Sequence, residues 1–203
     1  MYTDLALYAS LTFGWIGLHY YYNEYYLNAH NLTSRVVAYN HAVLSILFSG
    51  MALKYPTNRS LDTVYYTSVS FFIYETGVQL LKKNSLLKGA FLLHHMASIY
   101  TLQKVYEPKY SPLVLTALSV MEASNIPSHV VYFIRKLYPN FKYRYHFELG
   151  QAIIYSGLRI IGGTLIFTKA LSFSEDYTLI SLCGSIYLMG VIWSHKLWKA
   201  LLK

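Results

Sequence analysis

Two adjacent histidines, His94 and His95, are the residues of this sequence best suited to chemistry. They lie near the middle of Leu86–Gln103 (LLKGAFLLHHMASIYTLQ), an apolar run of helical length. An ionisable side chain is costly inside a lipid bilayer and is therefore usually functional there. A neutral imidazole can act as a general base, or it can take up an acyl group as a nucleophile. The pair therefore predicts an intramembrane site for acid–base or acyl-transfer chemistry.

Four other apolar runs each carry a polar residue that could join this site: His41, Glu75, Glu122 and Arg159. At a rise of about 1.5 Å per residue, His41 lies roughly 9 Å inside its run. Counted in the same way, Glu122 and Arg159 lie near the middle of their runs. We expect these groups to converge at one level, between the midplane and the cytosolic half of a membrane.

Each of these groups also has a purely structural interpretation. His41 could form a hydrogen bond between helices. Either Glu75 or Glu122 could pair with Arg159, because an unpaired charge in lipid is so costly. The adjacent histidines are harder to explain in this way. Neighbours on a helix point about 100° apart, so one can face a cavity while the other bonds a neighbouring helix.

A metal site is the first chemical alternative. The H-E-x-x-H spacing, which places two histidines on one helix face, is absent from the sequence. Adjacent histidines diverge, so a metal would also need His41 and a glutamate from other runs. The single cysteine, Cys183, excludes a disulfide framework and a cysteine-based metal site. We therefore expect neither a metal nor a bound cofactor.

Acyl transfer is the second alternative, and the sequence favours it. A carboxylate such as Glu75 or Glu122 would fix the tautomer of a histidine that acts as base or nucleophile. Arg159 could keep that carboxylate ionised, or it could contact a lipid headgroup. A cytosol-facing cavity with Lys and Arg at its rim would suit the phosphates of acyl-CoA, which we expect as the co-substrate.

The composition indicates that these residues are held by membrane helices. Of the 203 residues, 55% are hydrophobic and only 13% are charged, whereas roughly a quarter of a soluble domain is charged. The net charge of +8 comes from short basic clusters between apolar runs, which argues against a nucleic-acid partner. Seven runs are of spanning length, namely 5–22, 35–53, 63–81, 86–103, 111–134, 147–168 and 177–197. Pro127 is expected to kink the fifth.

The basic residues predict an orientation. Alternate connections carry eleven Lys and Arg residues on one side and five on the other, and the basic side of a membrane protein is normally cytosolic. The richer side includes Lys82 and Lys83 before the histidine run and Arg135 and Lys136 after the fifth run. The carboxyl terminus is therefore expected in the cytosol and the amino terminus in the lumen.

The same residues resemble the motifs of the TLC-domain family, which includes the ceramide synthases. Six pieces match in order: Ser34-Arg35 with His41-Ala42, Ser70–Glu75, the pair His94-His95, Met121–Pro127, Gly157–Arg159 and Trp193–Lys199. The resemblance implies an N-terminal span in residues 1–30 and a TLC domain with a six-helix core in residues 31–203. The resulting fold class is an all-α integral membrane protein of about seven helices around a polar cavity.

In the ceramide synthases, the paired histidines are needed for acyl-CoA-dependent N-acylation of a long-chain base. The resemblance therefore implies lipid metabolism or homeostasis, membrane lipids as partners, and the endoplasmic reticulum as location, and it leaves oligomer formation open. It assigns catalytic roles to His94, His95 and Glu122, and substrate binding to Arg35, His41, Glu75, Ser124 and Arg159.

One departure from the ceramide synthases keeps an alternative open. Those enzymes carry two aspartates in an Asp-x-x-Asp arrangement, whereas this sequence has Glu122 and Asn125. The alternative is a non-catalytic lipid-binding or trafficking protein, a regulator of membrane composition that uses the same polar cavity. A transporter is disfavoured because no inverted repeat is visible.

Overall fold

The computed structural model describes residues 2–27, 29–81 and 86–202, and every regular element in these ranges is a helix. Lys82 and Lys83, which the sequence assigns to the basic side, lie outside the described residues. The main helices are α1 (Tyr2–Tyr22), α2 (His30–Lys54), α3 (Asn58–Leu81), α4 (Leu86–Gln103), α5 (Ser111–Leu137), α6 (Arg144–Ser156), α7 (Gly163–Phe173) and α8 (Tyr177–Leu201).

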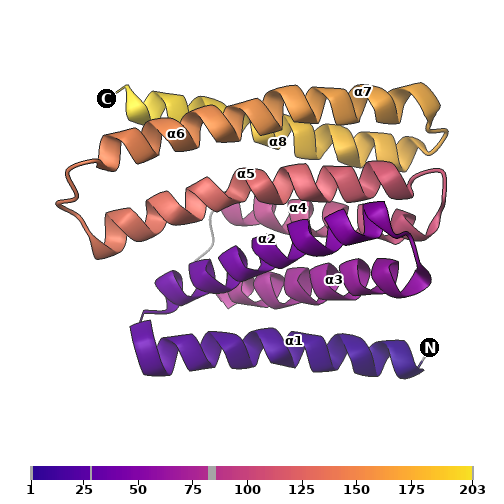
Figure 1. The fold of residues 1–203 in the computed structure, drawn as a ribbon, viewed down its shortest axis with the longest axis horizontal. Coiled ribbons are helices and arrows are strands. Elements are labelled where there is room, and N and C mark those ends of the chain that lie inside the picture. Colours follow the sequence, from indigo (N-terminus) through magenta and orange to yellow (C-terminus); the bar gives the residue numbers. More distant parts are fainter. Residues whose placement is uncertain (1, 28, 82–85, 203) are drawn as a thin grey trace.

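Shorter helical turns link several of these helices. A π-helical turn, η1 (Asn23–Leu27), follows α1, and a 3₁₀ turn, η2 (Lys104–Tyr106), follows α4. A second π-helical turn, η3 (Gly157–Gly162), joins α6 to α7, so these two helices form one continuous rod. Successive rods run in alternating directions, and the two termini lie at opposite ends of the bundle (Figure 1).

The observed helices extend the predicted runs mainly at their polar ends. The histidine run is α4 with the bounds expected from the sequence. Helix α5 continues through Pro127 to Leu137, whereas the predicted run stops at residue 134. Helices α2 and α3 begin five residues before the predicted starts at 35 and 63. Apolar content locates the middle of a membrane helix, but backbone hydrogen bonding continues beyond it into polar sequence.

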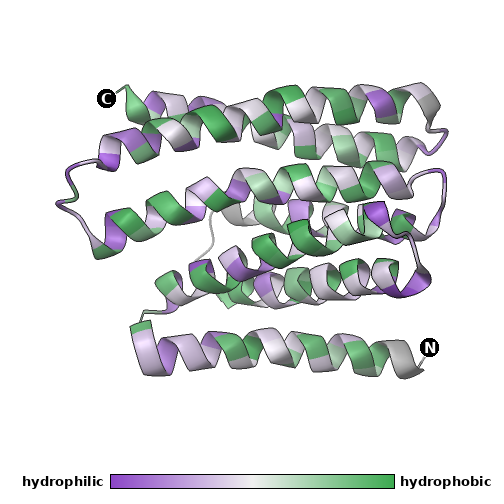
Figure 2. Ribbon diagram, viewed as in Figure 1, coloured by the Kyte–Doolittle hydropathy of each residue, from purple (hydrophilic) through white to green (hydrophobic). Residues whose placement is uncertain are grey.

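The outer surface of the bundle is apolar, as a membrane protein requires. Leu5, Phe13, Ile161 and Leu165 are each at least 66% exposed, and Figure 2 shows apolar residues along every helix. Three segments are long and apolar enough to cross a membrane by length and composition: His30–Lys54, Arg144–Ser172 and Tyr177–Leu201. The chain is thus an all-helical protein with three candidate membrane spans among its described residues.

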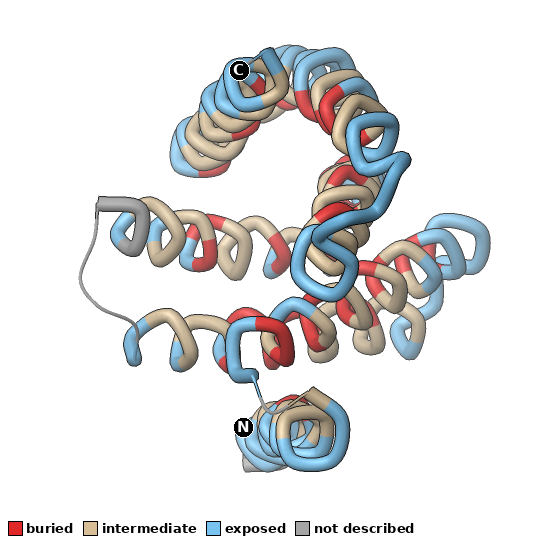
Figure 3. Tube along the Cα trace, turned by 90° about the vertical axis from the view of Figure 1, so that its left-hand side faces the viewer, coloured by how far each residue is buried: buried red, intermediate tan, exposed pale blue. Residues whose placement is uncertain are grey.

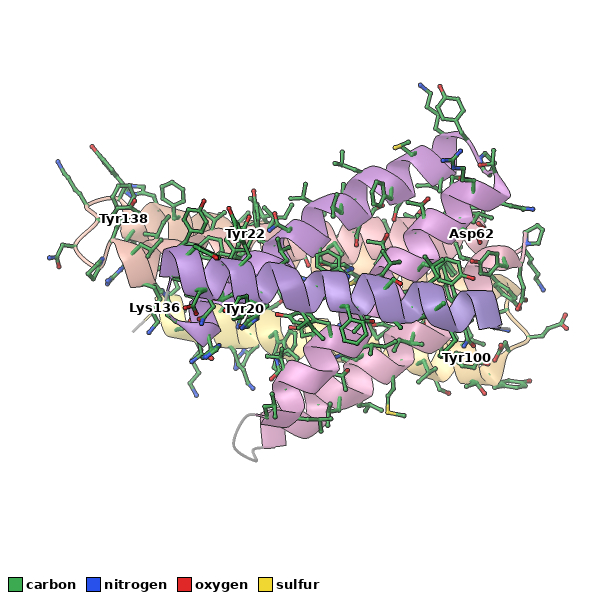
Figure 4. All side chains as sticks on the ribbon, turned by 90° about the horizontal axis from the view of Figure 1, so that it is seen from below. Tyr20, Tyr22, Asp62, Tyr100, Lys136 and Tyr138 are labelled. Atoms are coloured by element: carbon green, nitrogen blue, oxygen red, sulfur yellow. The ribbon has the colours of Figure 1, made fainter. Side chains whose placement is uncertain are left out.

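Polar and aromatic side chains gather at the two ends of the rods. Tyr22, Lys136 and Tyr138 lie at one end, and Asp62 and Tyr100 lie at the other (Figure 4). Tyrosine is enriched where membrane proteins meet the lipid headgroups, because its ring is apolar and its hydroxyl is polar. The arrangement is the one expected of rods that end at two membrane surfaces.

The interior of the bundle carries the polar residues. Helices α2 and α5 pack together along much of their length, and the buried residues face inward in the view along the rods (Figure 3). They include His41, Ser68, His95 and Arg159, each at most 3% exposed. Helix α1 lies at the outside of the bundle (Figure 3), where Trp15 Nε1 donates to Ser70 Oγ of α3 at 3.1 Å. The core therefore positions a polar site.

Candidate functional site

A cavity of about 310 Å³ lies between α2, α3, α4, α5, the α6–η3 rod and α8. We call it the main pocket. Six of the eight predicted site residues line it: Arg35, Glu75, His94, His95, Glu122 and Arg159. The other two, His41 and Ser124, are not among its lining residues and lie against residues that are. The structure thus brings the predicted residues together, and their roles stay predictions.

The imidazole of His95 is held at both nitrogens. Its Nδ1 lies 3.0 Å from the hydroxyl of Thr76, and its Nε2 lies 3.3 Å from Glu75 Oε2. A carboxylate only accepts hydrogen bonds, so the pair fits a tautomer with the proton on Nε2 and the threonine hydroxyl donating to Nδ1. His95 is 2% exposed. Its ring is therefore fixed in orientation by two neighbouring residues of α3.

The ring of His94 is held differently. Its Nδ1 is buried and has no hydrogen-bond partner among the described residues. Neighbouring residues on a helix point about 100° apart, and His94 lines both the main pocket and a second cavity beside it. The structure thus separates the two histidines into one that is anchored and one whose Nδ1 is free.

A buried network links Glu122 to Arg159 through an amide. The Asn125 amide donates from Nδ2 to Glu122 Oε2 at 3.2 Å, and its Oδ1 accepts from Arg159 Nη2 at 3.0 Å. Arg159 Nε donates to Ser124 Oγ at 2.7 Å. Neither Glu75 nor Glu122 forms a direct ion pair with Arg159 in the described part of the chain. The predicted contact between Arg159 and a carboxylate is instead relayed by Asn125.

Arg159 reaches this network from the π-helical turn η3, which is an element often found at functional sites. Its aliphatic stem packs on Gly190 of α8, where an added Cβ would lie 3.2 Å from both Cβ and Cδ of Arg159. Small residues allow close approach between membrane helices. Gly190 therefore makes room for the buried guanidinium group, a role that the sequence did not reveal.

His41 lies behind the main pocket and is fully buried. Its ring stacks on Phe71 with centroids 3.8 Å apart, and its Nε2 lies 3.0 Å from Ser45 Oγ one turn along the same helix. Its Nδ1 lies 3.9 Å from Glu122 Oε1, which is beyond hydrogen-bond distance. Glu122, the carboxylate predicted to orient the catalytic histidines, therefore lies beside His41, while Glu75 contacts His95.

A family model described as the TLC domain matches residues 5–199, which is most of the chain. The chain belongs to the TLC-domain family. This membership and the apolar helices make it an integral membrane protein of lipid metabolism or homeostasis. No curated protein and no solved structure matches the chain. The division of this TLC-domain protein at residue 31 stays a prediction.

The second cavity of the TLC-domain protein measures about 70 Å³ and is mostly apolar. We call it the side pocket. It shares His94, Glu122, Asn125 and Arg159 with the main pocket, and it extends between α4, α5, α7 and α8 to Phe167. Cys183, the only cysteine of the chain, also lines it. The two cavities thus meet at the polar network, with His94 at their junction.

Sequence reasoning did not select three further residues of the main pocket of the TLC-domain protein: Asn125, His129 and Lys196. Helical spacing offered a way to find two of them. Asn125 and His129 follow Glu122 by three and seven residues, which places all three on one face of α5.

Among the described residues, no group of three or more His, Cys, Asp or Glu side chains is close enough to hold a metal ion.

Proposed function

We propose that this protein is a membrane acyltransferase that moves an acyl group from acyl-CoA to an amine or hydroxyl of a membrane lipid. The observation that carries the proposal is the position of His94. This residue lines both a polar and an apolar cavity, and its Nδ1 has no partner in the described part of the chain. A neutral imidazole so placed can take a proton from a lipid amine or hydroxyl.

The proposal includes the full membrane arrangement. Successive rods run in alternating directions (Figure 1), with α3 strongly tilted against α1 (Figure 4). The shortest rod, α4, has 18 residues, which make it about 27 Å long at 1.5 Å per residue. That length approaches the roughly 30 Å of a hydrocarbon core. We infer that all seven rods cross the bilayer, that the carboxyl terminus is cytosolic and the amino terminus lumenal, and that the membrane is the endoplasmic reticulum.

In the proposed step, the lipid amine or hydroxyl attacks the thioester carbonyl of acyl-CoA. His94 accepts the proton of the attacking group as the new carbon–nitrogen or carbon–oxygen bond forms. The carbon–sulfur bond then breaks, and the leaving coenzyme A thiolate takes the proton from His94. The products are an acylated lipid and free coenzyme A, so atoms and charge balance.

Neighbouring residues support the geometry of this step. Thr76 and Glu75 hold the ring of His95 at its two nitrogens. This anchors the part of α4 that carries His94. Glu122 and Arg159, linked by Asn125, line both cavities at the junction. We assign the apolar side pocket to the acyl chain and the polar main pocket to the reacting groups. Arg159 is available to stabilise the negative charge that develops on the carbonyl oxygen.

The test is an activity measurement with three variants. Membranes that contain the wild type, His94→Ala, His95→Ala or His146→Ala at equal protein levels are supplied with labelled acyl-CoA, and their lipids are analysed by mass spectrometry. His146 is exposed and lies outside both pockets, so it serves as the control. We expect one N- or O-acylated lipid class to rise with the wild type and the control, and with neither pocket variant.

The opposite outcome identifies the alternative function. If the wild type and both pocket variants give the same lipid profile, His94 and His95 are structural. The protein would then be a lipid-binding or trafficking protein. Alkylation of Cys183 by a thiol reagent offers an independent readout, because a bound acyl chain in the side pocket should protect this residue whether or not acyl transfer occurs.

A further inference from the structure

The main pocket has a cationic end. Arg35 of α2 and Lys196 of α8 both line it, and neither forms an ion pair with any described residue. Arg35 instead lies over the ring of Tyr132, 5.2 Å from its centroid. The start of α2 and the end of α8 lie at the same end of the bundle (Figure 1). Two positive charges are thus left facing one end of the cavity.

Two other cations near this end, Arg135 and Arg144, share one carboxylate. Arg135 Nε donates to Glu148 at 2.8 Å, and Arg144 Nε lies 3.3 Å from the same carboxylate oxygen. Glu75, the acid that lines the main pocket near α3, is engaged by His95 at 3.3 Å. The carboxylates of the region thus contact other side chains, and Arg35 and Lys196, which are both exposed, are open to an anion from outside the chain.

A third group at this end lacks a partner. His129 of α5 is 5% exposed and lines the main pocket. Its Nδ1 is buried without a hydrogen-bond partner among the described residues, while the edge of Tyr39 supports its ring at a centroid distance of 6.3 Å. A buried polar atom without a partner is destabilising, so its presence in the same pocket as Arg35 and Lys196 indicates a missing hydrogen-bond partner.

A phosphate ester is the ligand that this set of groups would recognise. Its several oxygens can accept two hydrogen bonds from a planar guanidinium group and others from an ammonium and an imidazole. There is also room for what the phosphate carries. A third cavity of about 210 Å³ adjoins the main pocket through Arg35, Ser128 and Leu197, and it extends along the same end of the bundle.

We propose that Arg35, His129 and Lys196 form a subsite that binds the phosphate group of a phosphate ester at the cationic end of the main pocket. The inference rests on the proposed function in that it takes this pocket as the place where a lipid or its acyl donor binds. Two sources supply the same chemistry, namely the phosphates of coenzyme A and the headgroup of a phospholipid.

The experiment measures binding by the full chain in neutral detergent, with native mass spectrometry as the readout. The probes are coenzyme A without an acyl group, dioctanoyl phosphatidic acid, and dioctanoyl glycerol, which lacks phosphate. The variants are Arg35→Gln with Lys196→Gln, and His129→Gln alone. The matched control is Arg144→Gln with Lys199→Gln, which removes two exposed cations that line neither this pocket nor its neighbour.

We expect the wild type and the control to bind at least one phosphate probe and not dioctanoyl glycerol. The double variant should lose roughly tenfold or more in affinity for that probe, since it removes two charged hydrogen bonds, and His129→Gln should lose less. Binding of coenzyme A alone assigns the subsite to a soluble co-substrate. Binding of phosphatidic acid alone assigns it to a lipid headgroup, and binding of both assigns it to the phosphate itself.

The inference is overturned if neither phosphate probe binds, or if the double variant binds as the wild type does. Arg35→Lys provides a check on folding, because it keeps the charge and should retain part of the affinity. His94→Ala separates this inference from the proposed function. It should bind phosphate normally while it loses acyl transfer. If acyl transfer depends on His94 but the double variant binds phosphate as tightly as the wild type, the subsite is ruled out. The proposed function would then still stand.

Discussion

The protein has two polar regions, and they differ in whether their charged groups are paired with one another. Where the α4–α5 connection meets the α7–α8 turn, the charges are paired with one another. Lys104 Nζ lies 2.9 Å from Glu107 and 3.0 Å from Asp176, and Asp176 caps α8 by accepting from the Leu179 backbone N–H at 2.9 Å. We call this group the ion cluster. It needs no ligand to satisfy its polar atoms.

In the main pocket, several polar groups are left without such partners. The Nδ1 atoms of His94 and His129 are buried and have no partner in the described part of the chain, and Arg35 and Lys196 face the same cavity. A buried polar atom without a partner costs on the order of 1–3 kcal/mol. The comparison teaches that the ion cluster holds connections together, whereas the pocket gives up stability to keep groups available for a ligand.

The largest effect should come from Asn125→Leu, which breaks the buried network between Glu122 and Arg159 in the main pocket. Asn125 joins the Glu122 carboxylate to the Arg159 guanidinium, so both charged groups would lose a buried partner. We expect a loss of about 3 kcal/mol or more, seen as a fall of roughly 6–12 °C in the melting temperature in detergent. Asn140→Leu, in an exposed connection, is the control. A melting temperature equal to the control would show that the network contributes little.

An intermediate effect of opposite sign is expected from His129→Leu. This variant replaces a buried imidazole that has an unpartnered nitrogen with an apolar side chain, so it should raise the free energy of unfolding by about 1 kcal/mol. The same variant should weaken phosphate binding. Thermal unfolding and native mass spectrometry on one preparation measure both. A lower melting temperature together with normal binding would contradict the idea that the pocket gives up stability for binding.

The smallest effects should come from the ion cluster. Asp176→Ala removes a helix cap and should cost at most about 1 kcal/mol, whereas Asp176→Asn keeps a capping oxygen and should cost a few tenths. The Leu179 backbone N–H and the Lys104 ammonium hold the pKa of Asp176 below its usual range. Thermal melting of both variants would check the order of these effects. An equal loss for Asn and for Ala would show that the charge of Asp176 matters here more than its capping oxygen.

The lowered pKa of Asp176 also fixes the direction of a pH dependence. The unfolded chain binds the proton more tightly than the folded one, so the stabilisation is present above about pH 4 and is lost as the pH falls through the folded value. The difference in melting temperature between the wild type and Asp176→Asn should therefore shrink from pH 6 to pH 3. Glu175→Gln, at the exposed neighbouring position, is the control.

The sequence predicted the helices and most of the polar residues that line the main pocket better than it predicted which side chains contact one another there. The run 86–103 is α4 itself, and six predicted residues line one pocket. The choice of partners could not be predicted, because it depends on how each helix is rotated about its axis. Membrane helices are apolar on nearly all sides, so periodicity does not set that rotation. His95 therefore pairs with Glu75, which the sequence could not distinguish from Glu122.

Asn125 illustrates the same limit. In the sequence, it is a departure from the acidic pattern of the ceramide synthases. In the structure, its amide is a donor to a carboxylate and an acceptor from a guanidinium group, which an ionised aspartate could not be. Only the packing of the α6–η3 rod against α5, which brings Arg159 close to Asn125, reveals this role.

The π-helical turn η3 has a consequence for how this chain can vary. A π-helical turn holds more residues than an α-helical turn, so loss of one residue from Gly157–Gly162 would restore a regular helix and leave α6 and α7 in nearly the same rotation about their common axis. The packing of Gly163 against Tyr187 would then be kept, whereas the wider turn from which Arg159 reaches Ser124 and Asn125 would be lost. Among natural variants, a deletion in this turn should therefore preserve the fold of the rod and disturb the buried network of Arg159.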